Sequence, residues 1–228
     1  MQSKTDFKYP ADVVWACAAA ADRINGGYRK TSNWDYNEDD PIESPGNKTR
    51  VLRWLEQWRN NQLRKFEVTD QDTADGKRAQ EFWQSQMLVL LDDSANDYLK
   101  ACVNAAHLTV VNSLTDVAVI ASAITAAKRE TRKQELIQRK HSLESKHVCA
   151  LGSSVNFDTE FEVVDSRYID RIGASAVECI AEGNLYMWWS RQHVEPGTYR
   201  FLKGRVKAHE KDYATGQPVT KLNYVKVH

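Results

Sequence analysis

The sequence has few cysteines, and no two of them lie close together. The chain of 228 residues carries four, which stand singly at Cys17, Cys102, Cys149 and Cys179 without a CxxC pair. A zinc ribbon or a small disulfide-bonded scaffold needs cysteines at short, paired spacings, so this pattern argues against both classes. We therefore expect reduced and mostly buried thiols in a cytoplasmic protein.

A long uninterrupted apolar run is also missing. The longest apolar region, 108–127, is broken by Asn112 and Asp116 and is rich in serine and threonine. Such a region favours a buried helix over a membrane span, which needs about 20 predominantly apolar residues. The first ten residues carry three charged side chains where a signal peptide needs apolar ones, so we expect neither export nor membrane insertion.

Neither sign of charge is in excess, because the chain contains 31 basic and 31 acidic residues. This balance argues against a protein coated in positive charge. The charges are unevenly distributed, however: residues 1–99 carry 13 basic and 17 acidic side chains, residues 100–150 carry 8 and 4, and residues 191–228 carry 8 and 3. We therefore expect any anion-binding surface in the second half of the chain.

Catalytic motifs are the last class of feature that the sequence lacks. No serine or cysteine stands in a recognisable nucleophile motif, and residues 45–49 lack the Gly-Lys-Thr of a phosphate-binding loop. Asp158, Glu160 and Glu162 share one strand face and would be able to chelate a metal ion, but a solvated acidic face is the simpler interpretation. We therefore expect no enzymatic activity, no cofactor and no metal site.

What the sequence does contain is a change of hydrophobic period. In residues 1–149 apolar residues recur at helical spacing, and in residues 150–228 the period falls to two, with turn signals between the runs. The main predicted helical segments are 11–24, 48–66, 78–91 and 113–127. The pattern predicts an α+β protein with two domains: an all-helical domain over 1–149, ending in a long connector helix, and a β domain over 150–228.

Five candidate strands fill the second domain. They span 155–168, 174–182, 185–190, 199–209 and 219–227. Five strands with a long first one fit a small, closed or partly closed barrel of the OB type. We therefore predict a C-terminal, five-stranded OB-like β-barrel.

The strand predicted over 199–209 has two chemically different faces. Leu202, Val206 and Ala208 fall on one face. The other face is aromatic at one end and basic along the rest, and it carries Tyr199, Phe201, Lys203, Arg205, Lys207 and His209. Phosphates bind lysine and arginine, and unpaired bases stack on aromatic rings, so this face is typical of a surface that holds single-stranded nucleic acid. A merely solvated outer face is the alternative.

Two adjacent tryptophans, Trp188 and Trp189, extend this interpretation to the strand predicted over 185–190. Adjacent residues of a strand point to opposite faces, so one of the two must lie on the outside or under a loop. Our candidates for stacking bases are Tyr186, Trp188, Tyr199 and Phe201. Our candidates for neutralising phosphates are Lys203, Arg205, Lys207 and Lys221.

The order of these motifs resembles a known kind of domain. Gly183-Asn184 precedes the aromatic strand, Pro196-Gly197-Thr198-Tyr199 leads into the basic strand, and the run 220–227 follows. Over residues 150–228 this pattern resembles the OB-like C-terminal domain of bacteriophage-encoded proteins of DNA replication and recombination. The resemblance implies nucleic-acid binding and does not extend to the helical domain.

These observations predict a non-enzymatic protein that binds single-stranded nucleic acid, and single-stranded DNA in particular, in phage or mobile-element DNA metabolism. The helical domain would then be free to contact a protein partner. Two alternatives stay open. The same aromatic and basic surface suits a protein-interaction adaptor or inhibitor that docks on a host or viral protein. The acidic residues suit a metal-dependent nuclease.

Overall fold

The computed structural model describes residues 7–35, 42–63, 67–157, 159–200 and 202–227. The chain divides into two compact units, Met1–Thr131 and Arg132–His228. The boundary lies inside the long helix α5 (Leu114–His141), so the last turns of this helix belong to the second unit. Each unit has its own hydrophobic core, one built mainly from helices and one from strands.

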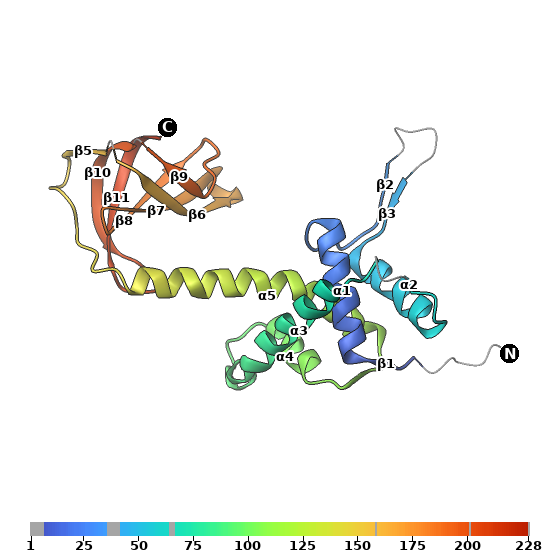
Figure 1. Ribbon diagram of the computed structural model, residues 1–228. Helices are drawn as coiled ribbons and strands as arrows, with labels where there is room; N and C mark the ends of the chain where they lie inside the picture. The colour runs from blue at the N-terminus through green and yellow to red at the C-terminus, as the bar shows by residue number, and fades with distance from the viewer. Residues whose placement is uncertain (1–6, 36–41, 64–66, 158, 201, 228) are drawn as a thin grey trace. The chain divides into compact units, whose positions relative to one another are not determined.

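The first unit is mainly helical (Figure 1). Besides the beginning of α5 it contains α1 (Ala11–Asn25), α2 (Asn47–Arg59), α3 (Asp70–Ser85), α4 (Asp97–Ala106) and a short 3-10 helix, η1 (Met87–Leu91). Short strands pair in twos: β1 (Tyr9–Pro10) with β4 (Val110–Val111), and β2 (Asn33–Asp35) with β3 (Ile42–Ser44).

The central element of this unit is α1, whose alanine-rich sequence is buried along most of its length. It packs against α2 and α3. The approach of α3 depends on Gly76, where an added Cβ would lie 2.6 Å from the backbone carbonyl oxygen of Trp15. The helix ends at Gly26, whose φ of 64° lies in the left-handed region that favours glycine.

Side chains fix the first residue of α3. Thr69 and Asp72 form a capping box, in which the Thr69 hydroxyl accepts from the Asp72 backbone N–H and the Asp72 carboxylate accepts from the Thr69 backbone N–H. The prediction of a helix beginning at 78 was therefore wrong at its N-terminal end. Residues 69–76 have the composition of a turn, but they contain the N-cap, Thr69, and the first turns of α3.

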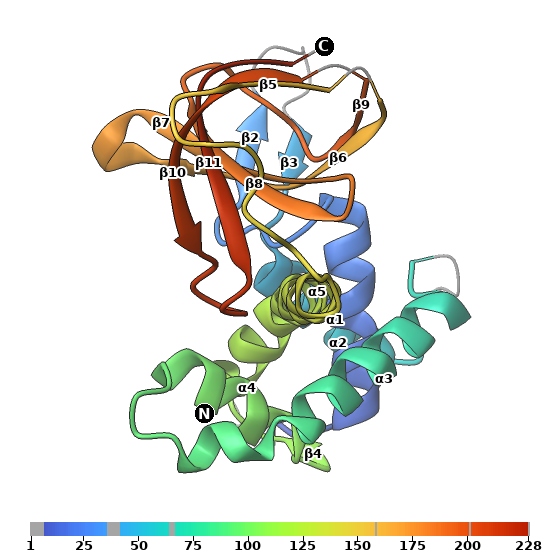
Figure 2. The same ribbon diagram turned by 90° about the vertical axis from the view of Figure 1, so that its left-hand side faces the viewer.

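The second unit is a curled, seven-stranded sheet (Figure 1, Figure 2). Its strands are β5 (Ser154–Phe157), β6 (Phe161–Ile169), β7 (Ala174–Ala181), β8 (Asn184–Ser190), β9 (Gly197–Tyr199), β10 (Leu202–Lys211) and β11 (Pro218–Val227). They lie in the order β5-β10-β11-β8-β7-β6-β9. The pair β8 and β11 is parallel, and the other neighbours are antiparallel.

The sequence predicted five strands, whereas this sheet has seven among the described residues. The expected strand 155–168 is divided into β5, which pairs with β10, and β6, which pairs with β7 and β9. The expected strand 199–209 is divided into β9 and β10, which also have different neighbours. A hydrophobic period of two shows only that side chains alternate between the two faces of a strand. It does not show where the chain stops pairing with one neighbouring strand and begins pairing with another.

Ion pairs tie the last turn of α5 to the sheet. Arg139 Nη1 donates to Glu162 Oε1 at 2.8 Å. Lys140, whose side chain is 7% exposed, contacts the carboxylates of Glu178 and Asp212. Burial alone would lower the pKa of Lys140, but Glu178 and Asp212 outweigh this effect and raise the pKa above its ordinary value. Ion pairs therefore hold the C-terminal end of α5 against the sheet of the second unit.

Candidate nucleic-acid interface

The predicted alternation of β10 is present from Leu202 to Lys207. Leu202, Gly204 and Val206 are buried, whereas Lys203, Arg205 and Lys207 are exposed. The alternation ends because the register with β11 shifts between Val206 and Ala208, which leaves Lys207 as the extra residue of a β-bulge. The basic face of β10 therefore consists of three residues.

His209 lies beyond this bulge and leaves the basic face. Its ring stacks on that of His147, with ring centroids 4.5 Å apart and planes at 1°. The Nε2 atom of His147 lies 2.8 Å from the backbone carbonyl oxygen of Glu210. The sequence predicted four residues on this face after Phe201, and the structure keeps the first three of them, Lys203, Arg205 and Lys207.

The three basic residues of β10 have different surroundings. Arg205 Nε donates to the carbonyl oxygen of Gly152 at 2.7 Å, which fixes the guanidinium group against the segment before β5. Lys203 is paired in register with Lys226 of β11, and both side chains are exposed. Like charges directly opposite each other are unfavourable unless an anion lies between them. This pair is therefore a place where a phosphate would relieve repulsion.

Two of the predicted stacking residues are in the core. Tyr186 is 1% exposed and Trp188 is 3% exposed. The Tyr186 ring packs edge-to-face on Phe157, with centroids 5.2 Å apart, and burial raises the pKa of its phenol. Neither side chain is exposed enough to stack on a base, so the prediction that these two residues stack bases was wrong. The physical reason is that both belong to the parity of β8 that faces the core.

Trp189 is the outward-facing tryptophan, with 45% of its surface exposed. In the register of the sheet it lies beside Ala176 of β7, which in turn lies beside Arg167 of β6. The sequence required one of the two tryptophans to be outside, and Trp189 is that residue.

The other two aromatic candidates do not add a described stacking surface. The ring of Tyr199 packs on Phe161, with centroids 5.8 Å apart and planes at 23°, and its hydroxyl donates to the Glu195 carbonyl oxygen at 2.8 Å. Tyr199 is thus half-buried, and both its ring and its hydroxyl contact other residues of the same unit. Phe201 lies outside the described residues.

A small hollow lies against the exposed indole. Its volume is about 60 Å³, and it is lined by Met187, Trp188, Trp189, Lys207, Glu210, Lys221 and Leu222. Lys221 Nζ lies 2.6 Å from Glu210 Oε2, so one of the two lysines is already paired with a carboxylate. Lys207 is the more available cation beside the ring.

A larger groove also lies against Trp189. It measures about 550 Å³, and its lining includes Trp189, Arg191, Tyr224 and Lys226. Tyr224 is 83% exposed and has a φ of 53°, at the point where β11 carries an extra residue relative to β10. The bulge therefore turns a second aromatic ring outward, next to two cations.

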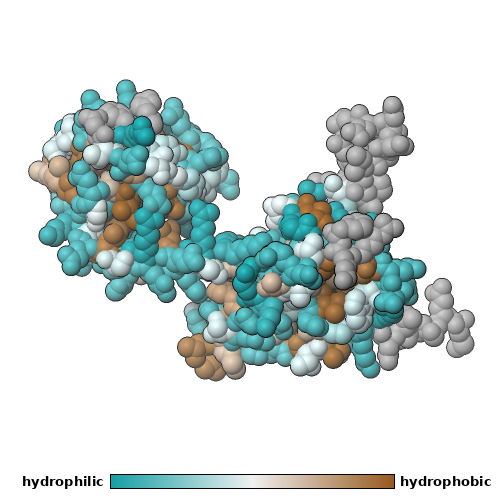
Figure 3. Space-filling view, in the orientation of Figure 1, coloured by the Kyte–Doolittle hydropathy of each residue, from teal (hydrophilic) through white to brown (hydrophobic). Residues whose placement is uncertain are grey.

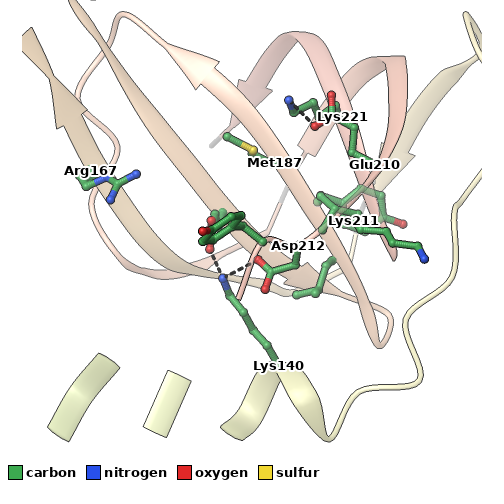
Figure 4. Close-up of a pocket in the computed structure, with 12 residues that line it drawn as sticks. Lys140, Arg167, Met187, Glu210, Lys211, Asp212 and Lys221 are labelled. Carbon is green, nitrogen blue, oxygen red and sulfur yellow. Dashed lines mark hydrogen bonds and ion pairs between the residues drawn. The ribbon is translucent and has the colours of Figure 1, made fainter. Parts of the chain in front are cut away.

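A third depression lies between the end of α5, the β10–β11 hairpin and the middle of β8 (Figure 4). It has a volume of about 260 Å³, and its lining combines apolar residues such as Leu185, Met187 and Val219 with charged ones. Figure 4 shows Lys140 reaching from the helix toward Asp212, and Lys221 paired with Glu210. Most charges here are compensated internally.

Neighbouring depressions share lining residues. The one at Lys140 shares Met187, Glu210 and Lys221 with the small hollow, and that hollow shares Trp188 and Trp189 with the large groove. We call this surface the β8–β11 track; its outward-facing members are Met187, Trp189, Arg191, Lys207, Glu210, Lys221, Tyr224 and Lys226. Figure 3 shows hydrophobic surface bordered by hydrophilic residues in this unit.

Three members of the track, Arg191, Tyr224 and Lys226, were not among the residues predicted from the sequence. Tyr224 follows Asn223 in a run of alternating residues, and its outward position depends on a bulge that no local motif marks. Arg191 lies two residues after Trp189, so its proximity to the tryptophan pair was available as a signal. The three residues nevertheless belong to the predicted chemical classes, an aromatic ring and two cations.

The acidic residues considered as metal ligands are not gathered. Glu162 is occupied by Arg139, and Glu160 Oε1 lies 3.5 Å from Arg200 Nε. Asp158 lies outside the described residues. Within the described part of the chain no group of three or more histidine, cysteine, aspartate or glutamate residues is arranged to hold a metal ion.

Comparison of the chain with family models, with curated proteins and with solved structures found no match. Among the helices of the described ranges, none is long and apolar enough to cross a membrane.

Proposed function

We propose that this protein binds single-stranded nucleic acid along the β8–β11 track. The observation that carries the proposal is the juxtaposition of two exposed rings, Trp189 and Tyr224, with Arg191 and Lys226 in one groove. Bases in a duplex have their faces covered by neighbouring pairs, whereas unpaired bases stack on aromatic side chains while cations neutralise the phosphates. A groove that offers both groups matches a single strand.

The length of the track is appropriate to several nucleotides. It extends from the neighbourhood of Leu185 to Arg191, and six residues of a strand cover roughly 20 Å. Sites of about 4 to 16 nucleotides are usual for one small barrel that binds single strands. In its specific form, the proposal is that the ligand is single-stranded DNA and that the protein acts in phage or mobile-element DNA metabolism. This form rests on the resemblance of residues 150–228 to the OB-like domain of phage replication and recombination proteins.

The proposal includes an OB-like barrel of five strands. When β5 and β6 are counted as two halves of one long strand, the pairing runs through β6, β7 and β8 to β11 and β10, and returns to that strand at β5. This cyclic order fits a five-stranded Greek-key barrel, in which the face of the second and third strands binds oligonucleotides. In this numbering β8 is the third strand, and it carries Trp189.

A direct experiment compares two aromatic variants by fluorescence anisotropy with a labelled oligothymidine and with a duplex of mixed sequence. Trp189→Ala combined with Tyr224→Ala should weaken single-strand binding by about 1 to 3 kcal/mol for each base that loses its ring. Tyr168→Ala is the matched control, because Tyr168 is 61% exposed and does not line the track. Preference for the duplex, or an unchanged affinity in the double variant, would refute the proposal.

A protein-docking function is the second candidate, and the carboxylates of the track favour it. Glu178 and Asp212 pair with Lys140, and Glu210 pairs with Lys221, so these two lysines are less available to phosphates at that end. Aromatic and arginine residues are also enriched at protein interfaces. In the same anisotropy assay, an adaptor of this kind would show no saturable binding of the oligonucleotide even at low salt.

A further inference from the structure

A second groove that joins aromatic rings with cations lies in the helical unit. Its volume is about 370 Å³, and it is lined by Tyr28, Lys30, Tyr98, Ser122, Thr125, Ala126 and Arg129. These residues come from three places in the sequence: the segment after α1, the first turn of α4, and one face of α5. All of them belong to the first compact unit, so the groove is complete within it.

The polar groups on the floor of this groove are already used. The Tyr98 hydroxyl donates to Ser122 Oγ at 2.9 Å, and Ser122 Oγ donates to the Val119 carbonyl oxygen at 2.9 Å. Thr125 Oγ1 donates to the carboxylate of Asp22, which also accepts from Lys128 Nζ at 2.6 Å. A ligand would therefore find no unsatisfied hydroxyl on the floor, and it would have to be recognised by the rings and by the cations.

The groups that remain available are one exposed ring and two cations. Tyr28 is 42% exposed. Lys30 is exposed and forms no ion pair within the part of the chain that the structure describes. Arg129 is 69% exposed and lies 3.5 Å from Glu130, a surface ion pair of the kind that contributes little. The groove therefore presents a stackable ring face beside two positive charges.

The local charge is opposite to that of the unit around it. Residues 1–131 contain 16 basic and 19 acidic side chains, yet none of the seven residues that line the groove is acidic. Charge of one sign focused in a concave site attracts ligands of the opposite sign even when the surrounding surface does not. The complementary ligand is an anion that also carries a flat ring.

We propose that this groove is a second contact for single-stranded nucleic acid, with a base against Tyr28 and its flanking phosphates at Lys30 and Arg129. The inference takes the class of ligand from the proposed function of the β8–β11 track and adds a separate site on the helical unit. It gives that unit a role in binding a long single strand. Each site is complete within its own unit, so each would hold a strand by itself.

The test is photocrosslinking of the full-length protein to a 30-nucleotide single-stranded DNA that carries 5-iodouracil, followed by mapping of the crosslinked peptides. We expect crosslinks at Tyr28 in the parent protein as well as at Trp189. In Lys30→Ala with Arg129→Ala, the Tyr28 crosslink should disappear while the Trp189 crosslink persists. The matched control is Lys77→Ala with Arg78→Ala, which removes the same charge from an exposed part of the unit and should leave both crosslinks intact.

Affinity measurements on the same variants give a second readout. Loss of Lys30 and Arg129 should flatten the plot of log affinity against log salt by about 0.7 for each lost phosphate contact to a single strand. That change should appear with the 30-nucleotide strand, and the control double variant should leave the slope at the parent value.

The pattern of crosslinks separates this inference from the proposed function. A crosslink at Trp189 without one at Tyr28 would overturn the second contact and leave the track standing. A crosslink at Tyr28 without one at Trp189 would support the groove and contradict the track. Absence of both crosslinks would overturn both proposals. A Tyr28 crosslink that survives in Lys30→Ala with Arg129→Ala, without a change of salt slope, would overturn the second contact alone.

Discussion

At the scale of single residues, the parity of β8 decides which aromatic ring is available to a ligand. Trp188 and Trp189 are neighbours in the sequence, but one packs inside the sheet core and the other faces outward. The buried ring contributes to stability by filling volume, and the exposed ring contributes a face for stacking. The two residues should therefore respond differently to the same substitution.

Replacing each tryptophan by alanine tests this division. We expect Trp188→Ala to lower the free energy of unfolding by about 3 to 5 kcal/mol, because it leaves a cavity in the core. Trp189→Ala should lower it by only about 1 kcal/mol, since nearly half of that side chain is already in water. Urea unfolding followed by circular dichroism measures both values. Equal losses would show that the two rings are not on opposite sides of the sheet.

Residue-level prediction from the sequence succeeded where a simple alternation was enough. The exposed positions of Lys203, Arg205 and Lys207 follow directly from a period of two. The choice of Trp188 over Trp189 failed because both parities of β8 contain an aromatic residue, so the pattern does not identify the core face. Tyr224 was missed because a bulge is a property of the pairing with another strand.

At the scale of elements, the start of α3 is held by a buried carboxylate. Asp72 is 1% exposed; it accepts from the Thr69 backbone, and both of its oxygens accept from Arg23 at 2.8 Å. Burial alone would raise the pKa of Asp72, but Arg23 and Thr69 outweigh it and hold the pKa below the ordinary value of 3.8. The charged carboxylate thus links α3 to the end of α1.

This arrangement predicts a pH dependence of stability. A carboxyl group whose pKa is lowered by folding stabilises the folded state at pH values above its pKa in the unfolded chain. This stabilisation is lost as the pH falls through the pKa of the group in the folded protein. Asp72→Asn should be less stable than the parent protein at pH 7, and its free energy of unfolding should fall less steeply below pH 3.8. Urea unfolding at pH 7 and at pH 3 measures this. Parallel acid profiles for the two proteins would contradict the role given to Asp72.

The sequence predicted which segments are helices and which are strands better than it predicted where each one begins and ends. The change of period near residue 150 predicted helices followed by strands, because hydrophobic spacing reports which faces are buried. The capping box at Thr69 and Asp72 was readable as a sequence pattern and would have corrected the start of α3. The divisions between β5 and β6 and between β9 and β10 depend on pairing between distant residues, so local patterns did not reveal them.

At the scale of the whole molecule, a neutral chain carries local surfaces of one sign. The equal totals of 31 basic and 31 acidic residues conceal the large groove on the sheet, where Arg191 and Lys226 occur without an acidic residue in the lining. Net charge therefore does not argue against phosphate binding when cations are concentrated beside exposed rings. The central claim is that these cations bind phosphates.

The most direct test of that claim is the salt dependence of oligonucleotide binding. Log affinity of the parent protein for single-stranded DNA should fall linearly with log salt, and Arg191→Ala with Lys226→Ala should reduce the slope by about 0.7 for each lost contact. Lys146→Ala with Arg171→Ala removes the same charge from exposed positions that do not line the track and should keep the parent slope. A parent slope near zero, or equal slopes in the two double variants, would contradict the account.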